Sequence, residues 1–212
     1  MKSPDHPIFI KSVQFIRERL DSTGLDPLQQ EVLERLIHSS GDFALMDSLR
    51  FSASSCEIGV NALLAGASIL VDTGMAHAGV EAMARRTLGT SVYCSLNWAT
   101  DLDNEAVTRS ARGMTIAWQE LTKKSDFGPA PIVLIGSAPT ALNALLDLVE
   151  KGFAKPSLVI GMPVGFIGVS QSKTRLAATD LANIRLTGSR GGAGLAAATL
   201  NALLRAAYLK MN

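Results

Sequence analysis

The sequence predicts a three-layer α/β domain, in which a five-stranded parallel sheet is covered by helices on both faces and preceded by a helical arm. Two observations support this class: short β-branched runs alternate with longer segments of helical periodicity, and small or polar residues follow most of the runs. Parallel strands need crossover connections, and those connections pack as helices on the sheet. With 212 residues, 47% of them hydrophobic, the chain is long enough to bury one sizeable core.

The expected strands share a high content of Val, Ile and Leu and lie at 68–72, 91–96, 131–136, 157–165 and 183–189. Between them, apolar residues recur at helical spacing, as at Leu142, Leu145 and Val149. Open α/β sheets bind ligands beyond the carboxyl ends of their strands, where helix N-termini present free N–H groups. Four glycine-containing turns therefore predict that one rim of the sheet forms the site: 72–74, 136–140, 161–165 and 188–194.

The first 50 residues do not follow this alternation. They predict helices at 6–20 and 28–37, the second opened by Asp26 as N-cap and by proline in the first turn. A third helix, about 54–65, leads into the first strand. We therefore expect a single domain over 1–212, with residues 1–50 as a helical arm and 51–212 as the doubly wound core. The arm is expected to lie across the crevice or across a partner subunit.

Composition excludes several functional classes. Lys and Arg number 20 against 19 Asp and Glu, so the net charge of +1 provides no field for nucleic acid. Cys56 and Cys94 form neither a zinc spacing nor a disulfide framework, which indicates a reducing cytoplasm. The N-terminus lacks the apolar core of a signal peptide, and no apolar run approaches the roughly 18 residues that a membrane helix needs. We expect a soluble cytoplasmic protein.

Three chemical motifs are weak. The cluster GSRGGAG follows the last expected strand rather than the first, and no Walker lysine accompanies it, so a tight turn is favoured over a nucleotide site. No G-x-S-x-G elbow occurs, which argues against a serine hydrolase. Asp72, Asp101 and Asp103 offer carboxylates for a cation, but caps and turns are the more frequent role of such residues.

The three histidines differ in their surroundings. His6 precedes a proline near the N-terminus and reads as an exposed turn residue, whereas His77 follows the first strand and reads as a helix-start residue at the rim. His38 ends an apolar helix, where the helix dipole is expected to raise its pKa and suit it to proton donation. The residues alone leave a structural and a catalytic role for His38 equally open.

Cations near these positions suggest an anionic ligand. Arg35 lies three residues before His38 and projects from a similar face, although an ion pair with Glu31 one turn earlier is an equal alternative. Arg109 and Lys173 each follow small polar residues near expected crevice-facing helix starts, and ordinary solvated positions are the alternative for both.

A set of ordered motifs resembles the precorrin-8X methylmutase family of cobalamin biosynthesis. Together they span about residues 6–205: IHSSGDF, LRFS, DTGMAHAGV, TRSA, IGSAPTAL, GMPVGFIGVSQSK and GGAGLAAATLNAL. The resemblance implies a flavodoxin-like sheet, a homodimer with substrate sites near the subunit interface, and an isomerase without a separate cofactor or metal. It also implies a methyl shift on a corrinoid-precursor macrocycle, giving hydrogenobyrinic acid or, with cobalt present, cobyrinic acid.

The resemblance places the catalytic histidine at His38 and substrate contacts at Ser12, Arg35, Arg109 and Lys173. The macrocycle carries many carboxylates, so cations and N–H donors must gather locally in a nearly neutral protein. The sequence departs from the family pattern at four positions, none of which is a proposed site residue: Ala76, Ser137, Gln171 and Ala193.

Two further hypotheses compete with the isomerase. One is a non-catalytic corrinoid carrier that holds the macrocycle and hands it on; the other is a nucleotide- or flavin-binding protein. Turnover followed by the visible spectrum separates the first from an enzyme, and co-purifying flavin absorbance would support the second. Both branches of the pathway use one fold, so the substrate is expected either with or without cobalt.

Overall fold

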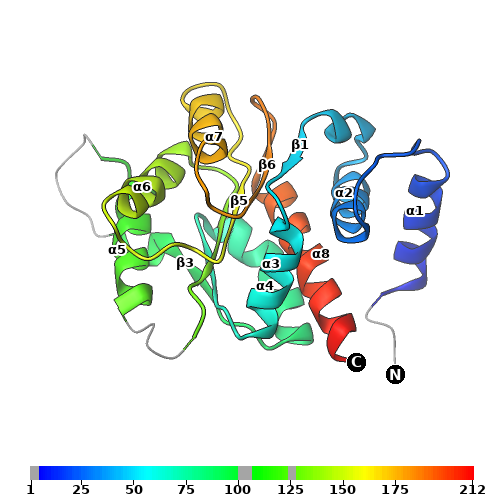
Figure 1. The fold of residues 1–212 in the computed structure, drawn as a ribbon, viewed down its shortest axis with the longest axis horizontal. Helices are drawn as coiled ribbons and strands as arrows, with labels where there is room; N and C mark the ends of the chain where they lie inside the picture. The colour runs from blue at the N-terminus through cyan, green and yellow to red at the C-terminus, as the bar shows by residue number, and fades with distance from the viewer. Residues whose placement is uncertain (1–4, 100–106, 124–127) are drawn as a thin grey trace.

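The computed structural model describes residues 5–99, 107–123 and 128–212, and Figure 1 shows them as a sheet between two layers of helices. The strands are β1 (Leu49–Phe51), β2 (Ile69–Val71), β3 (Val92–Cys94), β4 (Ile132–Ile135), β5 (Leu158–Gly161) and β6 (Asn183–Leu186). The α-helices are α1 (Pro7–Arg17), α2 (Pro27–Ser40), α3 (Ser55–Leu64), α4 (Gly74–Thr87), α5 (Arg109–Lys123), α6 (Pro139–Glu150), α7 (Val169–Ala177) and α8 (Ala193–Met211). Two short 3₁₀ helices, η1 (Phe43–Asp47) and η2 (Ser95–Trp98), complete the described elements.

The sheet has the order β1-β6-β5-β4-β2-β3. Strands β2 to β6 are parallel, which confirms the five predicted strands and the doubly wound class. Their order reverses between β2 and β4, as in flavodoxin-like sheets.

A sixth strand, β1, was not predicted. It pairs antiparallel with β6, with Leu49 opposite Leu186 and Phe51 opposite Ile184. The strand has only three residues with an arginine in the middle, which is too short a pattern to predict a strand. Its backbone is held instead by pairing with the edge of β6. The boundary expected at residue 50 therefore falls within a strand of the sheet.

The two faces of the sheet bury separate cores. Ile69 and Val71 of β2 point into the core formed with α3, α4 and α8, whereas Leu70 points into the core formed with α5, α6 and α7. Strand side chains alternate between faces, so a parallel strand with cover on both sides must be apolar at every position. Figure 1 shows the two helical layers on either side of the strands.

The arm lies outside the layer that contains α8. Helix α2 packs on α8 and α1 packs on α2, so α1 is the outermost element in Figure 1. The predicted cap of α2 is confirmed: the Asp26 carboxylate accepts hydrogen bonds from the N–H groups of Leu28 and Gln29.

The predicted end of α2 at residue 37 was wrong. The helix continues to Ser40 and ends at Gly41, whose φ of 68° suits glycine. The hydroxyls of Ser39 and Ser40 donate to the carbonyls of Arg35 and Leu36 one turn earlier, so both serines belong to the last turn.

Candidate active site

His38 lies where α1 crosses the last turn of α2. Its Nδ1 is 2.7 Å from the hydroxyl oxygen of Ser12 on α1, and the Phe9 ring meets the imidazole edge-on with the ring centroids 5.0 Å apart. These contacts fix the ring plane and leave Nε2 without a hydrogen-bond partner among the residues that the structure describes. The predicted neighbours Ser12 and His38, which are twenty-six residues apart in sequence, are thus brought together.

Arg35 lies beside His38 on the same side of α2. Its guanidinium carbon is 4.7 Å from the centroid of the Phe9 ring, an arrangement that favours a cation over the aromatic face. The alternative expectation, an ion pair with Glu31, is wrong, because the Glu31 carboxylate accepts from Arg205 at 2.9 Å. Within the described part of the chain, Arg35 forms no ion pair.

The pKa of His38 moves in the direction opposite to the one expected from the helix dipole. Partial burial lowers the pKa of the imidazole, and the positive charge of Arg35 lowers it further. Because α2 continues to Ser40, His38 is not the terminal residue of the helix, and the charge that acts on its imidazole is that of Arg35. The neutral form is therefore favoured in the free protein.

A hollow of about 520 Å³ opens in front of His38. Its lining comes from the segment before α1, from α1 and α2, and from the last turn of α4: Asp5, His6, Pro7, Phe9, Arg35, His38 and Arg86. Sequence reasoning did not find Phe9 or Arg86 for this site. Neither belongs to a motif, and only the packing of α1 and α4 around α2 brings them to the histidine.

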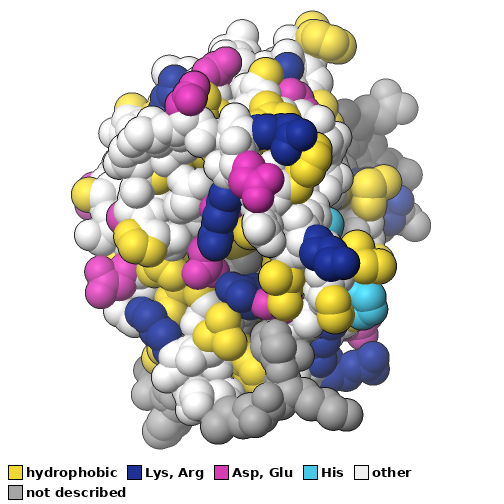
Figure 2. Space-filling view, turned by 90° about the vertical axis from the view of Figure 1, so that its right-hand side faces the viewer, with side chains coloured by type: hydrophobic (Ala, Val, Ile, Leu, Met, Phe, Trp, Pro, Cys, Tyr) yellow, Lys and Arg dark blue, Asp and Glu magenta, His cyan; other side chains and the backbone are white. Residues whose placement is uncertain are grey.

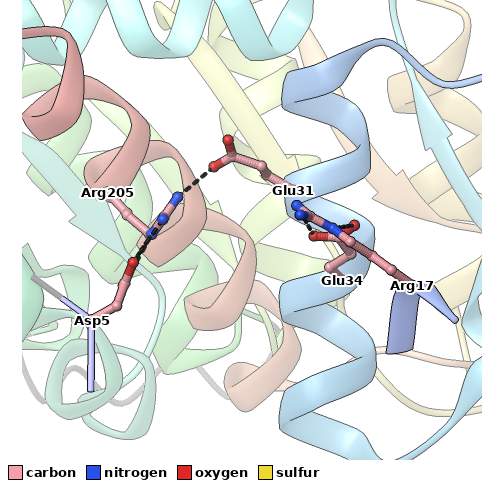
Figure 3. A network of polar contacts seen from close by, with 5 residues as sticks. All are labelled: Asp5, Arg17, Glu31, Glu34 and Arg205. Atoms are coloured by element: carbon pink, nitrogen blue, oxygen red, sulfur yellow. Dashed lines mark hydrogen bonds and ion pairs between the residues drawn. The ribbon is translucent and has the colours of Figure 1, made fainter. Parts of the chain in front are cut away.

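Ion pairs fasten the arm on the other side of Arg35, around a second cavity of about 340 Å³. Arg17 at the end of α1 binds the buried carboxylate of Glu34 through two bonds of 2.7 and 2.9 Å. Arg205 of α8 binds Asp5 at 2.6 Å and Glu31 at 2.9 Å. Figure 3 shows both groups of contacts, one joining α1 to α2 and the other joining Asp5 and α2 to α8.

The rim at the carboxyl ends of the strands is built differently from the expectation. The buried carboxylate of Asp72, directly after β2, accepts from the N–H groups of Gly136, Ser137 and Ala138 at 3.1, 2.7 and 3.0 Å. The N–H groups just before α6 thus have a hydrogen-bond acceptor within the chain, the carboxylate of Asp72. Of the four turns expected to bind ligand, the one at 136–140 therefore presents no free donors at these three residues.

Lys173 of α7 also turns inward at this rim. Only 2% of it is exposed, and its ammonium donates to the carbonyls of Gly188 and Arg190 at 2.9 and 2.5 Å. Burial lowers the pKa of this lysine to about 8. In this arrangement the ammonium shapes the glycine-rich turn 188–194 and does not face the hollow of His38.

Arg109 lies in the opposite helical layer. It is exposed and is the first residue of α5, whose N-terminus is capped by the hydroxyl of Thr108. Since α5 covers the face of the sheet away from α2, one subunit does not bring Arg109 to His38. Three of the predicted site residues therefore lie together: Ser12, Arg35 and His38. The other two, Arg109 and Lys173, lie apart from this group and from each other.

The remaining candidates have structural partners. His6 caps α1 by accepting from the N–H of Ile8, and His77 approaches the carbonyl of Val92 at 3.3 Å. Asp101 and Asp103 lie outside the described residues. No cluster of three metal-ligating side chains occurs among the residues described, and no helix there is long and apolar enough to span a membrane.

Charge is mixed over the face on which the arm lies. Figure 2 looks onto this side and shows positive, negative and hydrophobic side chains interspersed over the part that is coloured. The net charge of +1 agrees with this picture. Recognition of an anion on this face therefore depends on a few cations close together.

Comparison with known proteins gives a consistent result. A family model described as precorrin-8X methylmutase matches residues 7–206. A cobalt-precorrin-8 methylmutase from Synechocystis sp. is 33% identical over 96% of this chain and 97% of its own length. A precorrin-8X methylmutase from Pseudomonas aeruginosa is 38% identical over 92% and 93% of the two chains.

A solved structure extends the comparison to the fold. The precorrin-8X methyl mutase from Thermus thermophilus superposes with a TM-score of 0.83 at 34% identity, covering 95% of this chain and 98% of that one. These relatives carry the names of enzymes, so the alternative expectation of a non-catalytic carrier is not supported. The match of the family model over residues 7–206, together with these relatives, shows that the chain belongs to the precorrin-8X methylmutase family, isomerases of cobalamin biosynthesis.

Proposed function

We propose that this protein shifts a methyl group on a precorrin-8 macrocycle, with or without cobalt, and that His38 supplies the proton that promotes the shift. The observation that carries this proposal is the group formed by Ser12, Arg35 and His38 beside an open hollow. A hydroxyl orients the imidazole, a guanidinium that forms no ion pair among the described residues lies next to it, and Nε2 faces the hollow as the atom available to the substrate. This is the arrangement that a general acid for an anionic substrate requires.

The lowered pKa of His38 couples protonation to binding. In the free protein, burial and the charge of Arg35 favour the neutral imidazole. A substrate carboxylate beside Arg35 would offset that positive charge and raise the pKa of His38. The imidazolium then hydrogen-bonds or protonates the ring system as the methyl group migrates, and the proton returns to His38 afterwards. The isomerisation therefore leaves the number of atoms and the charge unchanged.

We propose that the protein is a homodimer and that a second copy completes the substrate site. Arg109 and His38 lie on opposite sides of the sheet, so Arg109 would meet the macrocycle of a partner subunit. The loop before α7 supports an interface, because Phe166 and Ile167 are 90% and 89% exposed. For Lys173, the proposed contribution is to hold the turn 188–194 against the substrate through the two carbonyls that it binds.

Cytoplasmic location is part of the proposal. Both cysteines, Cys56 and Cys94, are buried free thiols, as is usual in a reducing compartment. The relatives named above are one cobalt-precorrin-8 enzyme and two precorrin-8X enzymes, so the two substrates are both candidates. Incubation of the purified protein with each substrate, followed by visible spectroscopy, decides between them through the ratio of the two rates.

Replacement of His38 by Ala tests the reaction. We expect turnover to fall by about 10²- to 10⁴-fold, the usual contribution of a general acid, while binding of the tetrapyrrole product persists. The matched control is His77→Ala, since the polar contacts of His77 are with Val92 and Glu81 and it does not line the hollow. Full activity of His38→Ala would exclude the acid role, and product binding without turnover in the wild type would favour a carrier.

The pH dependence adds a second readout. For a protonated acid with a lowered pKa, kcat/KM of the free enzyme should decline as pH rises through a value below the ordinary 6.5 of histidine. In the Arg35→Gln variant this decline should move to higher pH, because one of the two causes of the lowered pKa is removed.

A further inference from the structure

Two hollows lie side by side along the arm and differ in how their charges are balanced. In the cavity of about 340 Å³, Arg17 binds Glu34, and Arg205 binds Asp5 and Glu31. These guanidiniums are neutralised by carboxylates of the chain. The larger hollow, in front of His38, is lined by two arginines and one carboxylate, Asp5, which is already bound to Arg205.

Arg86 is the second cation of that larger hollow. It lies in the last turn of α4, and its Nε donates to the sulfur of Met83 at 3.3 Å, a neutral partner that holds the stem of the side chain. No carboxylate among the described residues forms an ion pair with Arg86. Its side chain is exposed, and its terminal nitrogens are therefore available to a ligand.

Arg35 and Arg86, which form no ion pair among the described residues, act on one another. Burial is the largest cause that lowers the pKa of Arg35, and the charge of Arg86, which lines the same hollow, lowers it further. Asp5 acts on Arg35 in the opposite direction and more strongly than Arg86, but its side chain is only 6% exposed and already binds Arg205 at 2.6 Å. Two like charges at one hollow cost free energy unless an anion lies between or beside them.

We propose that Arg86 and Arg35 form a carboxylate-binding subsite next to His38, which receives one acidic side chain of the corrinoid precursor. This inference rests on the proposed function, since it assigns a residue to the same substrate. Guanidinium groups bind carboxylates through paired N–H donors, so two of them fix the position and the orientation of the group that they hold. An acidic side chain anchored there sets the register of the macrocycle against Nε2 of His38.

Arg86→Gln tests the subsite, and Arg85→Gln is its matched control. Arg85 is the preceding residue on α4, is also exposed, and does not line the hollow. We expect Arg86→Gln to raise KM and to weaken binding of hydrogenobyrinic acid roughly tenfold, the effect of losing a charge-assisted hydrogen bond at an exposed site. Arg85→Gln should stay within about twofold of the wild type in KM, kcat and affinity.

A chemical probe identifies the group that Arg86 meets. The ester of hydrogenobyrinic acid in which every carboxyl group is methylated lacks all the carboxylates, so wild type and Arg86→Gln should bind it with equal affinity. Arg86→Lys, which keeps the charge but not the paired donors, should recover part of the lost affinity for the acid. Circular dichroism should show that all three variants are folded, since both arginines are exposed.

The outcomes separate this inference from the proposal on which it rests. Equal affinity of wild type and Arg86→Gln for the acid would overturn the subsite and leave the methylmutase function intact. An equal loss in Arg85→Gln would also overturn it, because the effect would then reflect only the general positive field of α4. A wild-type protein that neither binds nor converts a corrinoid would overturn both.

Discussion

Helices α1 and α8 lie in the same half of the molecule but are held by different forces. Eleven of the nineteen residues of α8 are buried, whereas Ile16 is the one buried residue that α1 contributes. Hydrophobic burial fixes α8, while α1 depends on Arg17–Glu34, Asp5–Arg205 and the bond between Ser12 and His38. The comparison teaches that one wall of the candidate active site, which carries Ser12 and Phe9, is built on an element with little buried surface, as is common for elements that admit a ligand.

The largest expected effect is on the free energy of unfolding, and it differs between the core and α1. Leu200 of α8 is fully buried, so Leu200→Ala should lower the free energy of unfolding by about 3 kcal/mol. The matched change in the arm, Ile16→Ala, should lower global stability by less than about 1 kcal/mol, because α1 can detach without exposing the sheet. Chemical denaturation measures the first value, and amide hydrogen exchange over 7–17 measures local opening of the arm. Equal global losses in the two variants would show that arm and core unfold together.

A smaller effect is expected at the ion pair that fastens α1. Arg17→Ala leaves the carboxylate of Glu34, which is 2% exposed, with only the amide of Gln30 as a partner, and should lower the free energy for local opening of α1 by about 2 kcal/mol. Lys123→Ala breaks the exposed pair with Glu120 and should lower the free energy for local opening of α5 by less than about 0.5 kcal/mol. Amide hydrogen exchange over 7–17 and over 109–123 compares the two pairs. A cost at Arg17 no larger than at Lys123 would mean that the arm is not held by this contact.

The smallest effect concerns a charge inside the rigid part of the molecule. The pKa of Lys173, about 8, lies below the ordinary lysine value of 10.5, so the unfolded chain holds this proton more tightly than the folded one. The charged form therefore opposes folding, and that opposition weakens as pH rises above 8. Between pH 7 and pH 9 we expect the wild type to gain about 1 kcal/mol relative to Lys173→Met. Denaturant titrations at the two pH values measure this difference, and a gain of the opposite sign would contradict the burial of the ammonium.

The sheet was predictable because its signal is local. The central strands β2, β4 and β5 are apolar at successive positions, since both of their faces are covered, and that pattern stands out between helical segments. Strand β1 carries no such signal, because its three residues take their register from β6. The end of α2 was missed for a related reason: Ser39 and Ser40 favour turns in general, but here their hydroxyls bond to carbonyls within the helix.

The site was predictable only in part. The resemblance gave His38, Ser12 and Arg35, and the structure brings these three together, whereas their contact with substrate remains a prediction. The sign of the pKa shift of His38 was predicted wrongly, because a dipole argument from sequence cannot include burial or the charge of a tertiary neighbour. Arg86 could not be foreseen, since its place beside His38 depends on how α4 packs against the helices around it.

The buried carboxylate of Asp72 affects which anions the edge of the sheet can bind. In flavodoxin-like sheets, a nucleotide usually binds where the strand order reverses, which here is between β2 and β4. Beside this point, Asp72 accepts hydrogen bonds from the N–H groups of Gly136, Ser137 and Ala138. A phosphate would have to displace the carboxylate from these three donors and would be repelled by its negative charge. We therefore expect this crevice to disfavour nucleotides, whereas the proposed anion site lies on the flank between α1 and α2.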